Sequence, residues 1–177
     1  MVKHLNLPLS YEDIENLNAG DSVLLSGPLF TARDAAHKRI VECIENGGQP
    51  PVEIKDGTVY YVGPCPNKPG DVIGSCGPTT SYRCDPYTPI LLEKGLKTMI
   101  GKGIRSKEVI DSIVKNHAVY FSGIGGAGAL YSQCVTSAEV IAYEDLGAEA
   151  LRILTVKDLP VIVAVDCKGN TVFAKLD

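Results

Sequence analysis

The sequence predicts an α/β domain with a mixed sheet, and three features lead to that fold class. Between residues 21 and 121, branched apolar runs that suit strands alternate with stretches of helical period. From residue 139 onward, strands follow one another without the helical pattern. With 177 residues, 45% hydrophobic and 21% charged, the chain can bury a core as a single domain over residues 1–177.

Boundary residues place the elements of the first half. Polar caps begin helices, and glycine or proline ends strands and helices. The first strand is expected to close at Gly27 and Pro28, and the turn residues Asp56 and Gly57 predict a hairpin. In chain order, the expected elements are a short capped helix from Ser10 to Leu17, a strand over 21–27, a helix over 31–46 and a hairpin over 52–62.

The second half is predicted in the same way. Thr79 or Thr80 suits the cap of a helix that we extend to Lys94, and Ser106 suits the cap of the next one. In chain order, the expected elements are a helix from about 79 to 94, a strand over 96–100, a helix over 106–115, and strands over 118–121, 139–143, 151–156 and 161–165.

The composition disfavours several classes of function. A formal net charge of −4 makes nucleic acid or an anionic membrane an improbable partner, because both require a basic face. No apolar run approaches the roughly 20 residues of a membrane span, and the first residues lack the apolar core of a signal peptide. We therefore expect a cytoplasmic protein, in which any anion site is local.

Residues 74–83, Gly-Ser-Cys-Gly-Pro-Thr-Thr-Ser-Tyr-Arg, predict a glycine turn that leads into a helix. Free N–H groups and the positive end of the helix dipole favour an anion at such a start. Arg83 lies four residues beyond Thr79, so both side chains would share one helical face. The pattern therefore predicts a carboxylate or phosphate site, with a capped helix and a surface arginine as the alternative.

Cations and hydroxyls follow three of the predicted turns. Arg33 is expected in the first turn of its helix, Thr79 and Arg83 follow the turn just described, and Lys102 lies between two glycines. In an α/β domain such turns gather at one edge of the sheet. Guanidinium and ammonium groups there would suit a small molecule with two carboxylates.

Two other patterns leave alternatives open. The run from Gly123 to Gly128 matches GxGxxG, and Glu144 follows at a spacing seen in dinucleotide sites, although a glycine turn that lets backbone approach a ligand or partner chain is the commoner explanation. The six cysteines contain no CxxC pair, and the spacings of Cys65, Cys76 and Cys84 fit no metal motif. A metal, if one is used, is expected to come from another chain.

Four ordered runs, GPLFTARDAAHKR, GPTTSYR, MIGKG and FSGIGGAGAL, resemble the β subunit of iron–sulfur hydro-lyases, the family of class I fumarase and L-tartrate dehydratase. The resemblance extends from Asp21 to Asp177. It implies a three-layer swivelling β/β/α fold, which corresponds to the C-terminal domain of single-chain class I fumarases. It also implies a partner α subunit, expected in an α2β2 assembly, that holds a [4Fe–4S] cluster, so this chain would supply no metal ligand.

The resemblance also implies roles for individual residues. Those assigned to substrate binding are Arg33, Thr79, Thr80, Arg83 and Lys102. Thr79 would lie near the reacting carbons as a candidate base, although a hydroxyl needs an activating partner, expected from the α subunit. His37 and Gly77 would lie next to these residues and help to position them, without contacting the substrate.

The sequence therefore predicts the β subunit of a fumarate hydratase, which interconverts fumarate and L-malate. The alternatives are an L-tartrate dehydratase β subunit and a non-catalytic domain that binds a small anion or nucleotide. Tyr82 is expected to reshape the pocket, which leaves the substrate open. The candidate partner face is Ile124, Ala127, Leu130 and Tyr131, unless these four side chains pack inside the domain.

Overall fold

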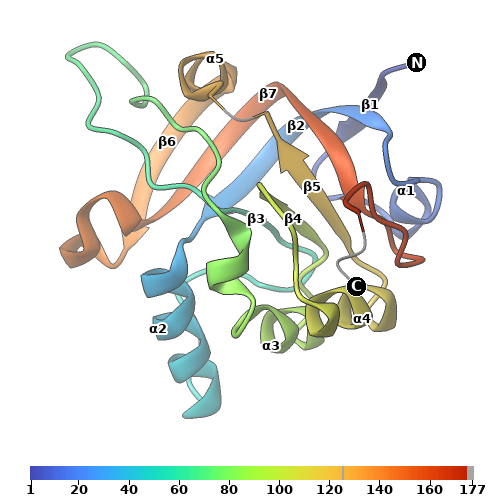
Figure 1. Ribbon diagram of the computed structural model, residues 1–177. Helices are drawn as coiled ribbons and strands as arrows, with labels where there is room; N and C mark the ends of the chain where they lie inside the picture. Colours follow the sequence, from blue (N-terminus) through green and yellow to red (C-terminus); the bar gives the residue numbers. More distant parts are fainter. Residues whose placement is uncertain (125, 175–177) are drawn as a thin grey trace.

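The computed structural model describes residues 1–124 and 126–174, and within them it shows a mixed α/β fold with seven strands in one sheet (Figure 1). The strands are β1 (Lys3–Asn6), β2 (Ser22–Thr31), β3 (Thr58–Tyr60), β4 (Thr98–Gly101), β5 (Val119–Gly123), β6 (Val135–Ala142) and β7 (Leu151–Val165). The helices are α1 (Tyr11–Glu15), α2 (Asp34–Glu45), α3 (Thr88–Glu93), α4 (Lys107–Lys115) and α5 (Gly128–Cys134), with 3₁₀ helices η1 (Ser81–Cys84) and η2 (Glu144–Glu149).

Five of the strands close into a ring. The sheet order is β1-β2-β3-β4-β5-β7-β6, and β2 also pairs with β7. Neighbours from β1 to β5 run parallel, whereas β7 runs antiparallel to β2, β5 and β6. The predicted mixed sheet is therefore confirmed. Because β2, β3 and β4 are parallel, their carboxyl ends lie at the same edge.

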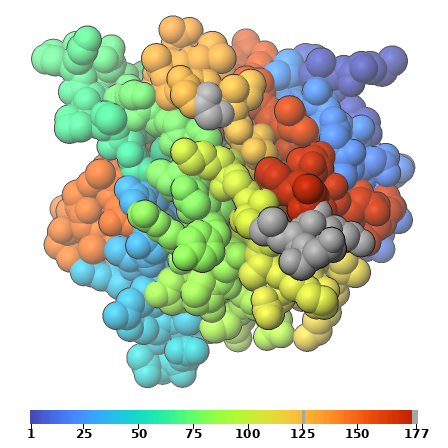
Figure 2. Space-filling model, viewed as in Figure 1, coloured from blue at the N-terminus to red at the C-terminus, as the bar shows by residue number. Residues whose placement is uncertain are grey.

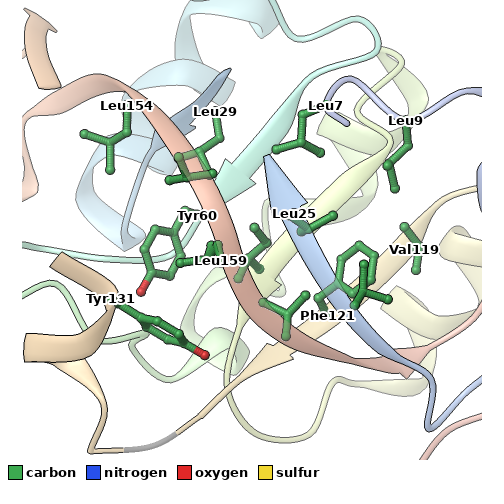
Figure 3. Close-up of a cluster of buried hydrophobic side chains, with 14 of the residues drawn as sticks. Leu7, Leu9, Leu25, Leu29, Tyr60, Val119, Phe121, Tyr131, Leu154 and Leu159 are labelled. Carbon is green, nitrogen blue, oxygen red and sulfur yellow. The ribbon is translucent and has the colours of Figure 1, made fainter. Parts of the chain in front are cut away.

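Two hydrophobic clusters pack on the two faces of the ring. The first fills its interior and includes Leu25, Phe121 and Leu159 (Figure 3). The second lies between the outer face of the strands and the helices α2, α3 and α4. Figure 1 shows these three helices together on one side of the sheet. Successive residues of β3 divide between them, with Val59 in the outer cluster and Tyr60 in the inner one, as the two-residue period of a strand requires.

The structure corrects the predicted hairpin over residues 52–62. Residues 52–57 contain no strand and turn at residues 55–56, and β3 pairs in parallel with β2 and β4. The Asp56–Gly57 signal is a real turn, in which Asp56 takes a φ of 57°. That turn only redirects the chain, because the partners of β3 come from distant segments.

The predicted helix from 79 to 94 is also wrong as a single element. The chain forms η1, then a turn, then α3, because prolines at 86 and 89 interrupt a continuous backbone ladder. Thr80 is the residue before η1, but its side chain makes no capping hydrogen bond.

Two predicted strand ends were also wrong. β2 continues through a bulge at Gly27, where φ is 130°, and Pro28 is accommodated because β1 pairs only as far as Ser26 and β3 begins pairing at Phe30. The two strands predicted over 151–165 are one strand, β7. The capped helices at Ser10 and Ser106 are confirmed by their side-chain caps.

No helix in the described part of the chain is long and apolar enough to cross a membrane.

We predict that Leu25→Ala will lower the free energy of unfolding by about 2–5 kcal/mol, because it leaves a cavity inside the ring where Leu25 is fully buried. Val140→Ala, on the exposed face of β6, should change stability by less than about 0.5 kcal/mol. Urea unfolding followed by circular dichroism measures both. Equal losses in the two variants would contradict the assignment of the ring interior as the core.

Candidate functional site

A pocket of about 200 Å³ lies at the edge where β2, β3 and β4 end. Figure 2 shows this part of the surface, where the green segment lies between the blue start of α2 and the yellow-green loop after β4. The lining residues are Arg33, Asp34, Pro78, Thr79, Thr80, Arg83, Cys84 and Lys102. All five residues to which the resemblance assigns substrate binding thus meet in one place, although their role stays a prediction.

Arg33 enters the pocket from the end of β2. It is the N-cap residue of α2, just before the first turn in which it was expected, and its side chain is 27% exposed. Its Nε lies 3.6 Å from Glu149 Oε1 and 3.9 Å from Asp34 Oδ1. The guanidinium also packs on Gly63, where a Cβ would lie 3.1 Å from Arg33 Cδ. Arg33 is therefore held in place and partly neutralised by carboxylates of its own chain.

Thr79 is fixed at the end of β3. Both its backbone N–H, at 2.8 Å, and its hydroxyl, at 3.0 Å, donate to the carbonyl oxygen of Tyr61. The hydroxyl proton is therefore engaged, and the hydroxyl oxygen can still accept a hydrogen bond. Among the described residues, no titratable side chain hydrogen bonds to this hydroxyl, so an activating base is not provided there.

Lys102 is positioned by a chain of hydrogen bonds at the end of β4. Thr80 forms a parallel bridge with Lys102, and Ser81 N–H donates to the Lys102 carbonyl at 3.0 Å. Lys102 N–H donates to Ser81 Oγ, which lies 2.9 Å from the Tyr120 hydroxyl, and Tyr120 in turn donates to Gly103. Gly101 must lack a side chain, because a Cβ would lie 1.9 Å from Ser81 Oγ.

A buried arginine that sequence reasoning missed lies behind the pocket. Arg105 Nε donates to Asp85 Oδ1 at 2.7 Å, and the other Asp85 oxygen accepts from Ser106 N–H at 2.7 Å. The Arg105 guanidinium also lies over the rings of Tyr61 and Tyr120, 5.2 and 4.7 Å from their centroids. No motif marked this contact, because Arg105 and Asp85 stand alone in loops twenty residues apart.

The charges of the lining are unevenly compensated. Arg83 and Lys102 are exposed and form no ion pair within residues 1–124 and 126–174. Arg33 instead forms an ion pair with Glu149, whose Oε1 is buried without a hydrogen bond. Glu149 was not identified from the sequence. The lining itself holds three cations and one carboxylate, that of Asp34, so it favours an anion even with Glu149 beside Arg33.

His37 lies behind Arg33 and is fully buried. Its Nδ1 lies 2.7 Å from the Arg33 carbonyl, which can only accept, so Nδ1 carries the proton and Nε2 is left without a partner. Burial is the main cause that lowers the pKa of His37 to about 4, and Arg105 adds to the effect. His37 is therefore neutral near pH 7 and contacts the backbone of Arg33 through this hydrogen bond. Gly77 packs against Gly128, where a Cβ would lie 3.3 Å from Gly128 Cα, and its supporting role stays a prediction.

The glycine run from 123 to 128 does not have the setting of a dinucleotide site. Its residue 125 lies outside the described part of the chain. A Cβ at Gly123 would lie 2.8 Å from Pro78, and one at Gly128 would lie 2.4 Å from Ser75, so these glycines allow close packing within the chain. The following strand, β6, pairs antiparallel with β7, whereas the dinucleotide fold needs a parallel βαβ unit.

The exposed fractions of side chains bear on two further expectations, the effect of Tyr82 on the pocket and the candidate partner face. Tyr82 is 64% exposed and is not among the residues that line the pocket, so it does not narrow it. Of the candidate partner face, Ile124 and Leu130 are exposed at 48% and 49%, whereas Tyr131 is buried. Tyr131 instead accepts from Ile124 N–H and donates to the Pro160 carbonyl.

The cysteines nearest the pocket do not form a cluster site. Cys76 and Cys84 are buried, Cys65 is exposed, and no group of three potential metal ligands in the described ranges includes any of them. Burial raises the pKa of Cys84 to about 12. These residues do not fit an iron–sulfur cluster.

A sequence model of the family described as Fumarase C-terminus matches residues 2–176. The chain belongs to this family. It is 39% identical over 154 residues to fumarate hydratase class I, anaerobic, of Escherichia coli (strain K12), covering 86% of this chain and 28% of that protein. It is 35% identical over 166 residues to fumarate hydratase 2 of Leishmania major, covering 93% of this chain and 29% of that protein.

A second kind of family member matches in length as well. The chain is 31% identical over 175 residues to the putative L(+)-tartrate dehydratase subunit beta of Methanocaldococcus jannaschii, covering 96% of this chain and 90% of that protein. The chain spans less than a third of the length of the fumarate hydratases just named. The resemblance to the hydro-lyase family is confirmed.

We predict that His37 makes stability depend on pH. Its pKa of about 4 lies below the ordinary 6.5, so the unfolded chain takes up the proton first. The contribution of His37 to stability is complete above pH 6.5 and is lost as pH falls toward 4, by about 3 kcal/mol. Urea unfolding near pH 7.5 and near pH 4.5 measures the loss.

The variant His37→Asn, whose amide can still donate to the Arg33 carbonyl, should lose less stability over this interval than the unsubstituted chain. His4→Asn is the matched control, because the His4 side chain is 69% exposed. An unchanged pH dependence in His37→Asn would show that this histidine is not the group that titrates.

Proposed function

We propose that this chain is the β subunit of a cytoplasmic class I fumarate hydratase, which adds water reversibly to fumarate to form L-malate. In this proposal the 200 Å³ pocket is one half of the active site, and a partner α subunit that carries a [4Fe–4S] cluster completes it in an α2β2 assembly. The observation that carries the proposal is the convergence of Arg33, Arg83 and Lys102 with two threonine hydroxyls.

The charge and size of the pocket support a small dicarboxylate. Arg33, Arg83 and Lys102 outnumber the carboxylates of Asp34, in the lining, and Glu149, beside Arg33, so the pocket keeps a net positive charge that suits an anion. The volume is below the about 300–1,000 Å³ typical of sites for drug-sized ligands. Because Arg83 and Lys102 have no ion pair in the described ranges, they are the best candidates to bind the two carboxylates directly, while Arg33 with Glu149 orients one of them.

The reaction explains why these residue types are needed. Loss of water from malate removes a weakly acidic proton beside a carboxylate, so negative charge grows on that carboxylate in the transition state. Fixed cations that face it stabilise this charge without reorganisation. Lys102, held through its own backbone by Ser81 and Thr80, and Arg83 provide such cations.

Thr79 is the candidate base. Thr79 lines the pocket, and its hydroxyl donates its proton to the Tyr61 carbonyl. A neutral hydroxyl is too weak a base to act alone, so the proposal includes a titratable group from the partner subunit that takes up the proton.

Apolar side chains beside the pocket support the presence of a partner. Tyr82, between Thr80 and Arg83, is 64% exposed, and Ile104, two residues after Lys102, is 45% exposed. Large exposed apolar side chains around a polar pocket are typical of a surface that another chain covers. The similarity to a protein named as a β subunit agrees with this arrangement.

L-tartrate dehydratase is the second candidate. One observation favours it, because the relative of matching length is named as the β subunit of that enzyme, whereas the fumarate hydratases are much longer. Both substrates are small dicarboxylates and need the same cations. An assay of the complex, co-expressed anaerobically with the α subunit and loaded with its cluster, on fumarate and on L-tartrate distinguishes them.

We predict that Arg83→Ala in this complex will lower kcat/KM by about 100-fold or more, because a charged hydrogen bond that strengthens in the transition state is lost. Arg39→Ala is the matched control, because Arg39 is paired with Asp145 and does not line the pocket. Steady-state kinetics on both substrates measures the effect. Equal activity in the two variants would remove Arg83 from the site.

We predict that Thr79→Ala will lower kcat by about 100-fold or more while the cluster content of the complex stays unchanged. The chemical step should slow because the candidate base is lost. Thr136→Ala, an exposed threonine on β6, is the control. Near-normal turnover by Thr79→Ala with an intact cluster would rule out the base assignment.

The non-catalytic alternative predicts a different result. If the chain binds a nucleotide, NAD or ATP should raise the melting temperature of the chain without a partner, because a ligand that binds only the folded state stabilises it. Protection by a nucleotide together with an inactive complex would overturn the hydratase proposal.

A further inference from the structure

Away from the pocket, three side chains from distant parts of the chain converge. Glu15 ends α1, His117 follows α4, and Cys167 follows β7. One carboxylate oxygen, one ring nitrogen and the thiol sulfur lie within 4.8 Å of one another. Within residues 1–124 and 126–174 this is the only group of three or more such ligands. Figure 1 shows α1 beside the red turn that follows β7.

We propose that Glu15, His117 and Cys167 form a site for one divalent transition metal, with Zn²⁺ as the preferred ion. Thiolate, imidazole and carboxylate together suit Zn²⁺, whereas Mg²⁺ and Ca²⁺ require oxygen ligands. The site is independent of the hydro-lyase proposal and uses none of the residues that line the pocket.

The two distances that involve Glu15 are close to those of tetrahedral coordination, and the remaining nitrogen–sulfur pair lies within 4.8 Å. His117 Nδ1 lies 3.6 Å from Glu15 Oε2, and Cys167 Sγ lies 3.7 Å from the same oxygen. Bonds of about 2.0–2.3 Å to a tetrahedral zinc place such ligands roughly 3.3–3.5 Å apart. The Glu15 side chain is 50% exposed and can move by these few tenths of an ångström. Three protein ligands leave the fourth position to water.

The histidine has the orientation that metal ligands show. His117 Nε2 lies 3.2 Å from the Tyr11 carbonyl, which can only accept, so Nε2 carries the proton. The Nδ1 lone pair is then directed toward the Glu15 carboxylate. At 3.6 Å these two groups repel unless a cation lies between them, and either a second ring proton or a metal ion can take that place. A metal-ligating histidine commonly donates its other ring N–H to a backbone carbonyl, as His117 does.

The ligands are also held by their surroundings. The His117 ring stacks on Tyr11 with centroids 3.7 Å apart. Cys167 is buried, and it lies in a turn that Asp166 stabilises by accepting from the N–H groups of Ala19, Lys168 and Asn170. When the metal binds, a metal–sulfur bond replaces the S–H bond and the thiol proton leaves to solvent. The metal would thus join α1 to the end of β7.

Cobalt tests the site, because Co²⁺ bound to a thiolate gives a charge-transfer band in the near ultraviolet and tetrahedral Co²⁺ gives intense visible bands. We expect the 177-residue chain, reduced and free of metal, to bind one Co²⁺ with both signals and to release it when Zn²⁺ is added. Cys167→Ser should abolish the charge-transfer band. Cys65→Ser, which removes an exposed cysteine elsewhere, should keep it.

A second pair of variants tests the site independently, in case Cys167→Ser does not fold. Glu15→Gln, on the exposed end of α1, should weaken Co²⁺ binding by about tenfold or more, whereas Glu12→Gln on the same helix should leave it unchanged. Zn²⁺ should also raise the melting temperature of the unsubstituted chain. A chain that gives no charge-transfer band with excess Co²⁺, or a band that persists in Cys167→Ser, would overturn the proposal.

Discussion

The pocket depends on one buried ion pair, that of Arg105 with Asp85. A guanidinium with no exposed side-chain surface is tolerable only when its donors are satisfied, and here Asp85, Thr88 and Tyr61 accept from it. These residues belong to the turn after η1, to α3 and to the segment after β3. The loop that carries Lys102 begins α4 through Ser106, whose N–H donates to Asp85. One contact therefore fixes three of the segments that surround the pocket.

The closed ring supplies the other half of the arrangement. The strands β2, β3 and β4 are parallel and end at the same edge. Arg33 and Lys102 directly follow β2 and β4, whereas Thr79 is held there by its hydrogen bond to the carbonyl of Tyr61, the residue after β3. The antiparallel β7 returns across β2, so η2, which precedes it, brings Glu149 to Arg33. The charge balance of the pocket is thus a consequence of strand topology, because Glu149 is 116 residues from Arg33 in the sequence.

Local chemistry was enough to predict much of this structure. Ser10 and Ser106 are caps because their hydroxyls are next to free N–H groups, and any such pattern can be recognised from a few residues. The gathering of Arg33, Thr79, Arg83 and Lys102 followed from the general rule that turns after parallel strands share an edge. Their convergence in one pocket agrees with that rule.

The rest depends on contacts between distant residues. The turn at Asp56 and Gly57 has the same local chemistry in a hairpin as in a crossover, so only the pairing of β3 with β2 and β4 decides between them. Likewise, β7 remains one strand because β2 pairs with it along most of its length. The burial of Arg105 and the place of Glu149 follow from the same long-range pairing, and no short sequence pattern encodes them.

The double hydrogen bond from Thr79 to the Tyr61 carbonyl has an entropic consequence for ligand binding. Because the amide and the hydroxyl end on one oxygen, the side chain has a single orientation before any ligand arrives. Immobilising a free side chain on binding costs about 0.5–1.5 kcal/mol for those with many rotamers, and a pre-ordered one avoids most of its own share. A ligand that contacts Thr79 therefore meets a side chain that these two hydrogen bonds have already ordered.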